Sequence, residues 1–276
     1  AESSPASDLV PADEAEESTS KHRGILGTDQ RELRSAYNGY SMTSYPYRAF
    51  GALVRPESSS LSVDCSANKI GPRHLLTSAH CVNVGKQGAN AGWTFRNWWP
   101  GADGVDDLQN GGSPSPNGEK NVLFYWVHSG WLDKKYWRDD YAVLILADTS
   151  SNCGLGWFGY SVDYSLAATS HHLWGYPANT LTCSASPFSD KHCAGSLYGD
   201  SRNISRTTSR YAYYYHDAQP GQSGSGVYEI NGSNRSIHAI HQGDWTAIEN
   251  RGVKIRGNVF DNIHGVKAFW NSTVCP

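Results

Sequence analysis

A serine set among glycines is the residue whose surroundings most favour chemistry. Ser223 stands in the run Gly-Gln-Ser-Gly-Ser-Gly at positions 221–226. Glycine lets the backbone adopt a positive φ and lets a substrate carbonyl approach the main chain closely. The N–H groups of Gly221 and Ser223 could then converge on a developing oxyanion. The run predicts Ser223 as a nucleophile with these two amides as its oxyanion hole, although such a run by itself is more often a plain turn.

A histidine and an aspartate that could activate this serine stand elsewhere in the chain. A serine hydroxyl becomes a good nucleophile when a base takes its proton and an acid fixes the tautomer of that base. His80 follows the apolar pair Leu75-Leu76, and Asp140 precedes the apolar run 141–146. Asp139 is the rival acid, but Asp140 lies directly against the apolar run. We therefore predict His80 and Asp140 as partners of Ser223 and expect Asp139 to be solvated.

The order His, Asp, Ser along the chain is that of the chymotrypsin-type proteases. Together with further motifs, it makes the chain resemble the trypsin-like serine proteases and, within them, the bacterial glutamyl endopeptidases. The motifs lie at 25–31, 45–49, 77–81, 129–131, 140–142, 158–161, 175–177, 221–226, 250–252 and 259–262. The resemblance implies an all-β fold of two antiparallel six-stranded β-barrels with the site in the cleft between them. It assigns 24–150 to a barrel carrying His80 and Asp140, and 151–276 to a barrel carrying Ser223.

Short apolar or alternating runs separated by Gly, Pro, Asn and Ser independently predict an all-β chain. The predicted strands are 47–54, 74–78, 122–128, 141–147, 172–176, 211–215, 226–230, 236–241 and 252–256. Residues 83–120 are rich in Gly, Asn and Trp, and we expect long surface loops there. Only the C-terminal end has helical spacing, which predicts a helix whose apolar face packs on the second barrel. The residues at that spacing are Val259, Phe260, Ile263, Val266 and Trp270.

Composition and cysteine content restrict the class of protein. A net charge of -3 over 276 residues gives no reason to expect a nucleic-acid partner, and no apolar run is long enough to span a membrane. Six cysteines favour an oxidising compartment, hence secretion, over reduced structural cysteines. The resemblance implies a Cys65–Cys81 disulfide, and Cys183 with Cys193 and Cys153 with Cys275 are the further expected pairs. We expect no metal and no cofactor, since no CxxC is present and neither 171–172 nor 192–193 has a second ligand pair at a useful spacing.

The first residues differ in composition from the rest of the chain. Residues 1–20 are rich in Ser, Glu, Ala and Asp, and cannot bury enough apolar surface to fold. A basic tripeptide then ends at Arg23, and the sequence that resembles the family begins at Gly24. We interpret 1–23 as an acidic propeptide removed by cleavage between Arg23 and Gly24, with a merely disordered tail as the alternative.

These observations predict a secreted, monomeric serine endopeptidase that hydrolyses polypeptides through an acyl-enzyme. The resemblance favours cleavage after glutamate, with His241 in the pocket wall and Lys254 as a tentative second donor. Asp217, six residues before Ser223, is where trypsins carry the aspartate that attracts Lys and Arg. Ala218 lacks the hydroxyl that glutamate-specific relatives place there. A trypsin-like enzyme cutting after Lys or Arg and a non-catalytic binding protein on the same fold remain the alternatives.

Four Asn-x-Ser/Thr sequons are candidate glycosylation sites if the source is eukaryotic. They begin at Asn203, Asn231, Asn234 and Asn271.

Overall fold

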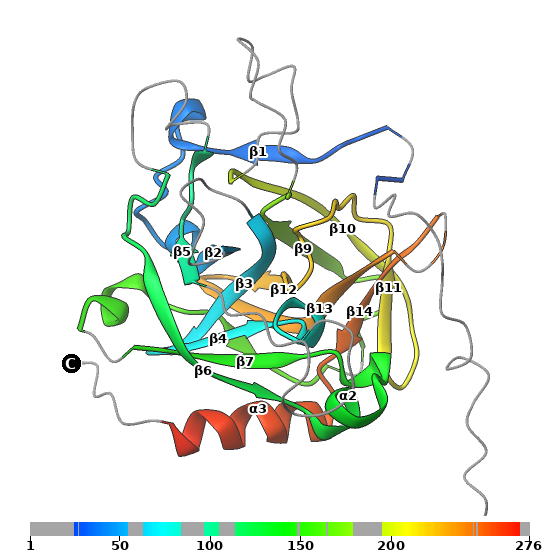
Figure 1. Cartoon of the computed structure of the whole chain (residues 1–276). Helices are drawn as coiled ribbons and strands as arrows, with labels where there is room; N and C mark the ends of the chain where they lie inside the picture. Colours follow the sequence, from blue (N-terminus) through cyan, green and yellow to red (C-terminus); the bar gives the residue numbers. More distant parts are fainter. Residues whose placement is uncertain are drawn as a thin grey trace, which may run out of the picture.

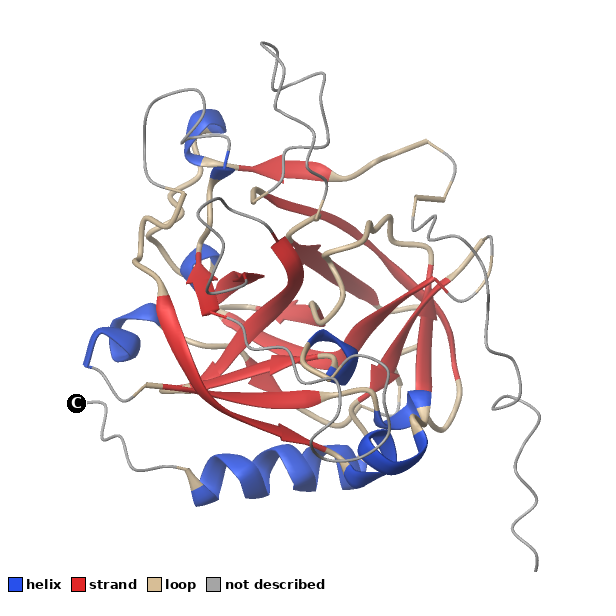
Figure 2. Ribbon diagram, in the orientation of Figure 1, coloured by secondary structure: helices blue, strands red, loops and turns tan. Residues whose placement is uncertain are grey.

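Two closed six-stranded antiparallel β-barrels make up the structure, a computed structural model that describes most of the chain between residues 25 and 270 (Figure 1). The described ranges are 25–26, 28–54, 63–83, 97–104, 114–147, 150–163, 165–178, 195–244, 246 and 248–270. Strands dominate and one longer helix lies near the C-terminus (Figure 2). The predicted fold class is confirmed.

The first barrel has the strand order β2-β3-β4-β7-β6-β5. Its strands are β2 (Phe50–Val54), β3 (Val63–Gly71), β4 (His74–Thr77), β5 (Asn97–Pro100), β6 (Lys120–Val127) and β7 (Ala142–Leu146). The short helix α2 (Ser129–Lys134) connects β6 to β7. All neighbouring strands of this barrel pair antiparallel.

The second barrel has the order β9-β10-β11-β14-β13-β12, closed by pairing of β12 with β9. Its strands are β9 (Ser170–Gly175), β10 (Leu197–Thr207), β11 (Tyr211–Tyr214), β12 (Gly226–Asn231), β13 (Asn234–Asp244) and β14 (Asn250–Lys254). Two short strands extend this sheet: β1 (Glu32–Arg34) pairs with β10, and β8 (Gly159–Tyr160) pairs parallel with β13. Although 24–150 was expected to form the first barrel, its N-terminal segment pairs with the second.

The expectation that 83–120 is entirely surface loop is wrong, because Trp98 on β5 is fully buried. Its indole lies against Gly51 of β2 so closely that a Cβ on Gly51 would come within 2.0 Å of the ring nitrogen. The indole N–H donates to the carbonyl oxygen of Ala67 at 3.4 Å. The Gly and Asn content of the region is typical of loops, so the four-residue strand β5 was not predicted. Trp98 on that strand is buried inside the barrel.

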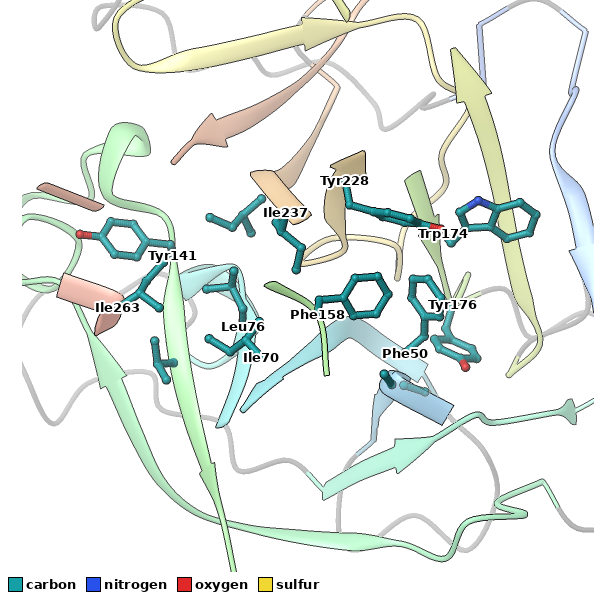
Figure 3. Packing of buried hydrophobic residues seen from close by; sticks show 14 of the residues in the cluster. Phe50, Ile70, Leu76, Tyr141, Phe158, Trp174, Tyr176, Tyr228, Ile237 and Ile263 are labelled. Carbon is teal, nitrogen blue, oxygen red and sulfur yellow. The ribbon is translucent and has the colours of Figure 1, made fainter. Parts of the chain in front are cut away.

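The largest hydrophobic cluster joins the two barrels (Figure 3). Phe50 on β2 lies 4.9 Å from Phe158, ring centroid to ring centroid, and Phe158 lies 5.1 Å from Tyr228 on β12. Phe158, between the barrels along the chain, is fully buried in this contact. The barrels are therefore held together by aromatic packing in their shared interface.

Helix α3 (Gly257–Phe269) occupies the predicted position but packs on more than the second barrel. Its buried residues Val259, Ile263 and Val266 belong to the cluster that spans both barrels. The Asn262 amide donates to the Tyr141 hydroxyl at 2.7 Å, and Trp270 stacks on Phe124 of β6 with centroids 4.5 Å apart. The expected contact with the second barrel alone was incomplete, since the helix also contacts the first.

We predict that Trp98→Ala lowers the free energy of unfolding by about 3–5 kcal/mol, because it leaves a large cavity in the first barrel. Urea unfolding followed by circular dichroism measures the loss. Trp157→Ala, at a partly exposed indole, is the matched control and should cost much less. A loss below about 1 kcal/mol for Trp98→Ala would mean that β5 does not pack as described.

Candidate active site

His80 and Asp140 meet at the end of the first barrel that faces the second. His80 lies in a short 3-10 turn after β4, and Asp140 lies two residues before the start of β7, the strand paired with β4. One carboxylate oxygen, Oδ1, accepts from the His80 backbone N–H at 2.8 Å, and Oδ2 lies 2.8 Å from His80 Nδ1. The Asp140 carboxylate is fully buried. It therefore fixes both the backbone and the ring of His80.

The carboxylate also controls the protonation of the imidazole. Burial lowers the pKa of His80, but the charge of Asp140 and its hydrogen bond outweigh that effect, so the pKa is raised above its ordinary value. Because Nδ1 donates to Asp140, the other ring nitrogen, Nε2, carries the lone pair when the ring is neutral. His80 is thus prepared to accept a proton at Nε2.

Ser223 is held in a turn that only glycine permits on either side. Gly221 has φ +94° and Gly224 has φ +85°, and a Cβ at Gly224 would come within 2.0 Å of the Thr77 hydroxyl. The Ser223 carbonyl accepts from the backbone N–H of Ser66 at 2.8 Å, which ties the turn to the first barrel. Within the described residues, the N–H groups of Gly221 and Ser223 have no acceptor. Both are therefore available to an oxyanion.

Gln242 on β13 links the two halves of the site, and no motif in the sequence indicated it. Its backbone carbonyl accepts from the Ser223 hydroxyl at 3.1 Å, and its side-chain amide donates to Asp140 Oδ2 at 3.2 Å. The same amide donates to the Trp137 carbonyl at 2.6 Å, and its oxygen accepts from Arg251 Nε at 2.9 Å. One residue of the second barrel therefore contacts both the serine and the aspartate.

His241, the neighbour of Gln242, is buried, with Nδ1 2.8 Å from the Tyr214 hydroxyl. Burial, with smaller contributions from His216 and His80, lowers the pKa of His241 to about 3. Burial also raises the pKa of Tyr214 well above 10, so that phenol keeps its proton. A protonated phenol donating to Nδ1 leaves the N–H of a neutral His241 at Nε2.

The Asp217 carboxylate is occupied by protein donors. It accepts from the backbone N–H of Leu26 at 2.7 Å, from that of Gln30 at 3.0 Å, and from Arg202 Nη2 at 2.9 Å. The carboxylate is fully buried. The segment just after the expected cleavage site is therefore bound to Asp217. Leu26 and Asp217 are 191 residues apart in the chain.

The two other predicted pocket residues are placed differently. Ala218 is buried in the apolar core of the second barrel, with Leu166 and Leu173 in the same cluster. Lys254 pairs with Ala239, two residues from the His241–Gly252 pair. In the described part of the chain no hydrogen bond joins Lys254 to His241, and the role of Lys254 in binding stays a prediction.

Asp139 is buried, which corrects the expectation that it is solvated. Its Oδ2 lies 3.5 Å from His128 Nδ1, and its Oδ1 lies 3.7 Å from Arg256 Nη2. Arg256 directly precedes α3, so a segment far along the chain covers this carboxylate.

The Cys65–Cys81 disulfide is present and joins β3 to the turn that carries His80. Cys153 is also disulfide-bonded. Cys183, Cys193 and Cys275 lie outside the described residues, as do Arg23, Gly24 and the sequon at Asn271. The sequons at Asn203, Asn231 and Asn234 begin at exposed residues of the second barrel.

Comparisons with known proteins agree with this geometry. No family model matches the chain. The glutamyl endopeptidase of Bacillus licheniformis is 28% identical over 249 residues, which are 87% of this chain and 68% of that protein. A solved Glu endopeptidase has a TM-score of 0.69 at 23% identity, covering 88% of this chain and 99% of that one. The protease Anisep of Arthrobacter nicotinovorans has a TM-score of 0.60 at 18% identity, covering 82% and 98%. The chain is therefore similar over most of its length to a bacterial glutamyl endopeptidase, and it has the two-barrel fold of the trypsin-like serine proteases.

Proposed function

We propose that this protein is a secreted, monomeric serine endopeptidase that cuts polypeptides after glutamate. The proposal of a catalytic function rests on one observation. The buried Asp140 carboxylate binds His80, and Gln242 contacts both Asp140 and Ser223 in the glycine turn. The Cys65–Cys81 disulfide supports secretion, because such bonds persist in oxidising compartments. In the described residues no helix is both long and apolar enough to cross a membrane.

In the proposed reaction, Ser223 attacks the scissile carbonyl carbon as its hydroxyl turns from the Gln242 carbonyl to His80. Nε2 of His80 takes the proton and then returns it to the leaving amine, which leaves the acyl group on Ser223. Asp140 stabilises the imidazolium in between. The N–H groups of Gly221 and Ser223 donate to the oxyanion. Water then attacks the acyl-enzyme by the same route, so the chain's own residues supply every proton transfer.

The proposed specificity for glutamate is supported by a neutral hydrogen-bond donor, the imidazole of His241. The Tyr214 hydroxyl lies 2.8 Å from Nδ1 of His241, and with that hydroxyl as the donor, Nε2–H would be the group that donates to a substrate carboxylate. The name of the Bacillus relative points to the same substrate. Ala218 supplies no hydroxyl, so His241 bears more of this recognition than it would beside a serine or threonine. We propose Lys254 as a second donor.

The Lys/Arg alternative has less support, because the carboxylate it requires is already saturated. Asp217 accepts two backbone N–H groups and the Arg202 guanidinium, and a substrate cation would have to displace them. The alternative of a non-catalytic binding protein leaves unexplained a buried carboxylate aligned on a histidine beside a serine turn. The protease proposal accounts for each of these contacts.

The bond from Leu26 to Asp217 supports the processing proposal. Cleavage between Arg23 and Gly24 would place a new α-amine two residues from an anchored backbone, within about 7 Å of it. That amine would add positive charge beside the pocket, where it favours a substrate carboxylate. Residues 1–23 would keep the enzyme latent by preventing this end from taking its position.

We predict that Ser223→Ala, His80→Ala and Asp140→Asn each lower kcat by about 10⁴-fold or more. The combined variants should lose little beyond that, because the three residues act as one unit. Steady-state kinetics on a peptide substrate measure the loss, and a fluorophosphonate probe should label Ser223 in the parent protein alone. Multiplying losses, or near-normal turnover by Asp140→Asn, would show that these roles are misassigned.

We predict that His241→Ala lowers kcat/KM for cleavage after Glu by a factor corresponding to about 2–5 kcal/mol, because the substrate carboxylate then lacks its donor. Tyr214→Phe removes only the hydroxyl that fixes the tautomer, and should lower the Glu value by about tenfold with little effect on Gln. A peptide-library digest read by mass spectrometry gives both preferences. Preferential cutting after Lys or Arg, untouched by His241→Ala, would contradict glutamate specificity.

We predict that a protein beginning at Ala1 with Arg23→Gln is inactive, whereas one beginning at Gly24 is active. In the shorter protein, Asp217→Asn should lower activity, because the carboxylate no longer holds the N-terminal segment. Peptide hydrolysis measured before and after treatment with trypsin separates the forms. Equal activity of the Arg23→Gln protein and the protein beginning at Gly24 would disprove latency.

A further inference from the structure

A second group of chemically active side chains lies outside the catalytic site, where three segments of the second barrel meet. Asp163 follows β8, Glu229 lies on β12 and His238 lies on β13. One possible ligand atom from each of the three lies within 4.8 Å of the others. We infer that these residues form a binding site for a divalent transition metal ion of the zinc class.

Hydrogen bonds fix which nitrogen of His238 can bind a metal. The Thr169 hydroxyl donates to the Leu166 carbonyl at 2.6 Å, so it can only accept from His171 Nδ1, 3.2 Å away. Nδ1 of His171 also lies 3.2 Å from the Thr169 carbonyl oxygen, a second acceptor. Nδ1 of His171 therefore carries the hydrogen, and its Nε2 is the acceptor.

His238 Nδ1 lies 2.9 Å from that acceptor and must donate to it. The lone pair of His238 is consequently at Nε2, which lies 3.0 Å from the hydroxyl of Ser161. That hydroxyl also lies 2.7 Å from the Ser236 hydroxyl, which can accept its hydrogen when an ion takes the lone pair. Metal-bound histidines are commonly oriented by such a hydrogen bond to the other ring nitrogen. His238 is thus preset as a nitrogen ligand, and at 4% exposure its ring has little freedom to turn away.

Two carboxylate side chains meet at this position. Two carboxylates this close repel each other, and in the described residues neither Asp163 nor Glu229 has an ion-pair partner. Asp163 Oδ1 accepts from the N–H and hydroxyl of Ser165, at 2.7 and 2.8 Å, which are neutral donors. A cation would remove the repulsion.

The donor set selects the kind of cation. One imidazole nitrogen with two carboxylate oxygens suits Zn²⁺, which takes four ligands and can add a water, whereas Ca²⁺ prefers six to eight oxygens. Asp163 and Glu229 are partly exposed, which gives an ion a path from solvent. The other group of this kind, Cys65, His80 and Cys81, is not a candidate because its two sulfurs form a disulfide.

The consequence would be structural, because the ion would join the segment entering the second barrel to the hairpin of β12 and β13. Isothermal titration of the chelator-treated full chain with ZnCl₂ tests this inference. We expect one ion per chain, with Asp163→Asn and His238→Asn each weakening binding by at least about 100-fold. His171→Gln should weaken it by about 10–100-fold, as loss of an orienting partner does. Asp261→Asn, at an exposed carboxylate on α3, is the matched control and should bind normally.

Thermal unfolding gives a second readout that is independent of activity. ZnCl₂ should raise the unfolding temperature of the parent protein and of Asp261→Asn but not that of Asp163→Asn, whose circular dichroism in chelator should match the parent. His80→Ala should bind Zn²⁺ as the parent does. Unchanged binding by both Asp163→Asn and His238→Asn would overturn the inference, as would loss of binding in His80→Ala.

Discussion

The arrangement of the catalytic site depends on the need to satisfy one buried charge. The Asp140 carboxylate has no contact with solvent, and an ionised carboxylate in that position is tolerated only with full hydrogen bonding. Two of its donors are the backbone and ring of His80 in the first barrel, and the third is the amide of Gln242 in the second. The aspartate therefore sets the position of one barrel against the other as well as the orientation of the histidine.

Gln242 extends this constraint into the second barrel. Its amide oxygen accepts from Arg251, whose guanidinium lies 4.5 Å from the ring centroid of Tyr211 and is almost fully buried. Because Arg251 packs on an aromatic ring and donates to Gln242, the amide group can present only its nitrogen to Asp140. The orientation of Asp140 thus depends on residues in β11, β13 and β14, which belong to the other barrel.

The sequence predicts those residues of the site that belong to a recognisable pattern with their neighbours in the chain. Ser223 with its glycines, and His80 and Asp140 beside their apolar runs, belong to local patterns. In the structure Asp140 binds His80, and Gln242 contacts both Asp140 and Ser223. Gln242 is in no such pattern, because its role arises only when β13 packs against the first barrel. Asp139 was expected in solvent because Arg256, which lies 3.7 Å from it, is distant in sequence.

The same reasoning applies to three other features of the structure. Trp98 stands in a segment whose Gly and Asn content is typical of loops, and only the barrel's closure shows that its ring is interior. Asp163, Glu229 and His238 have no ligand spacing to find, since three separate segments contribute one side chain each. The contacts of Asp217 with Leu26, Gln30 and Arg202 were not predicted, because those partners become its neighbours only after folding.

The anchoring of Leu26 by Asp217 also has a consequence for the order in which the chain acquires structure during synthesis. The two residues are 191 positions apart. At about 5–20 residues per second, the ribosome needs about 10–40 s to add the aspartate after the leucine. The first barrel can close in that interval, whereas β1 has no strand to pair with until β10 emerges. Strand β1 therefore leaves the ribosome early but pairs with its neighbouring strand late.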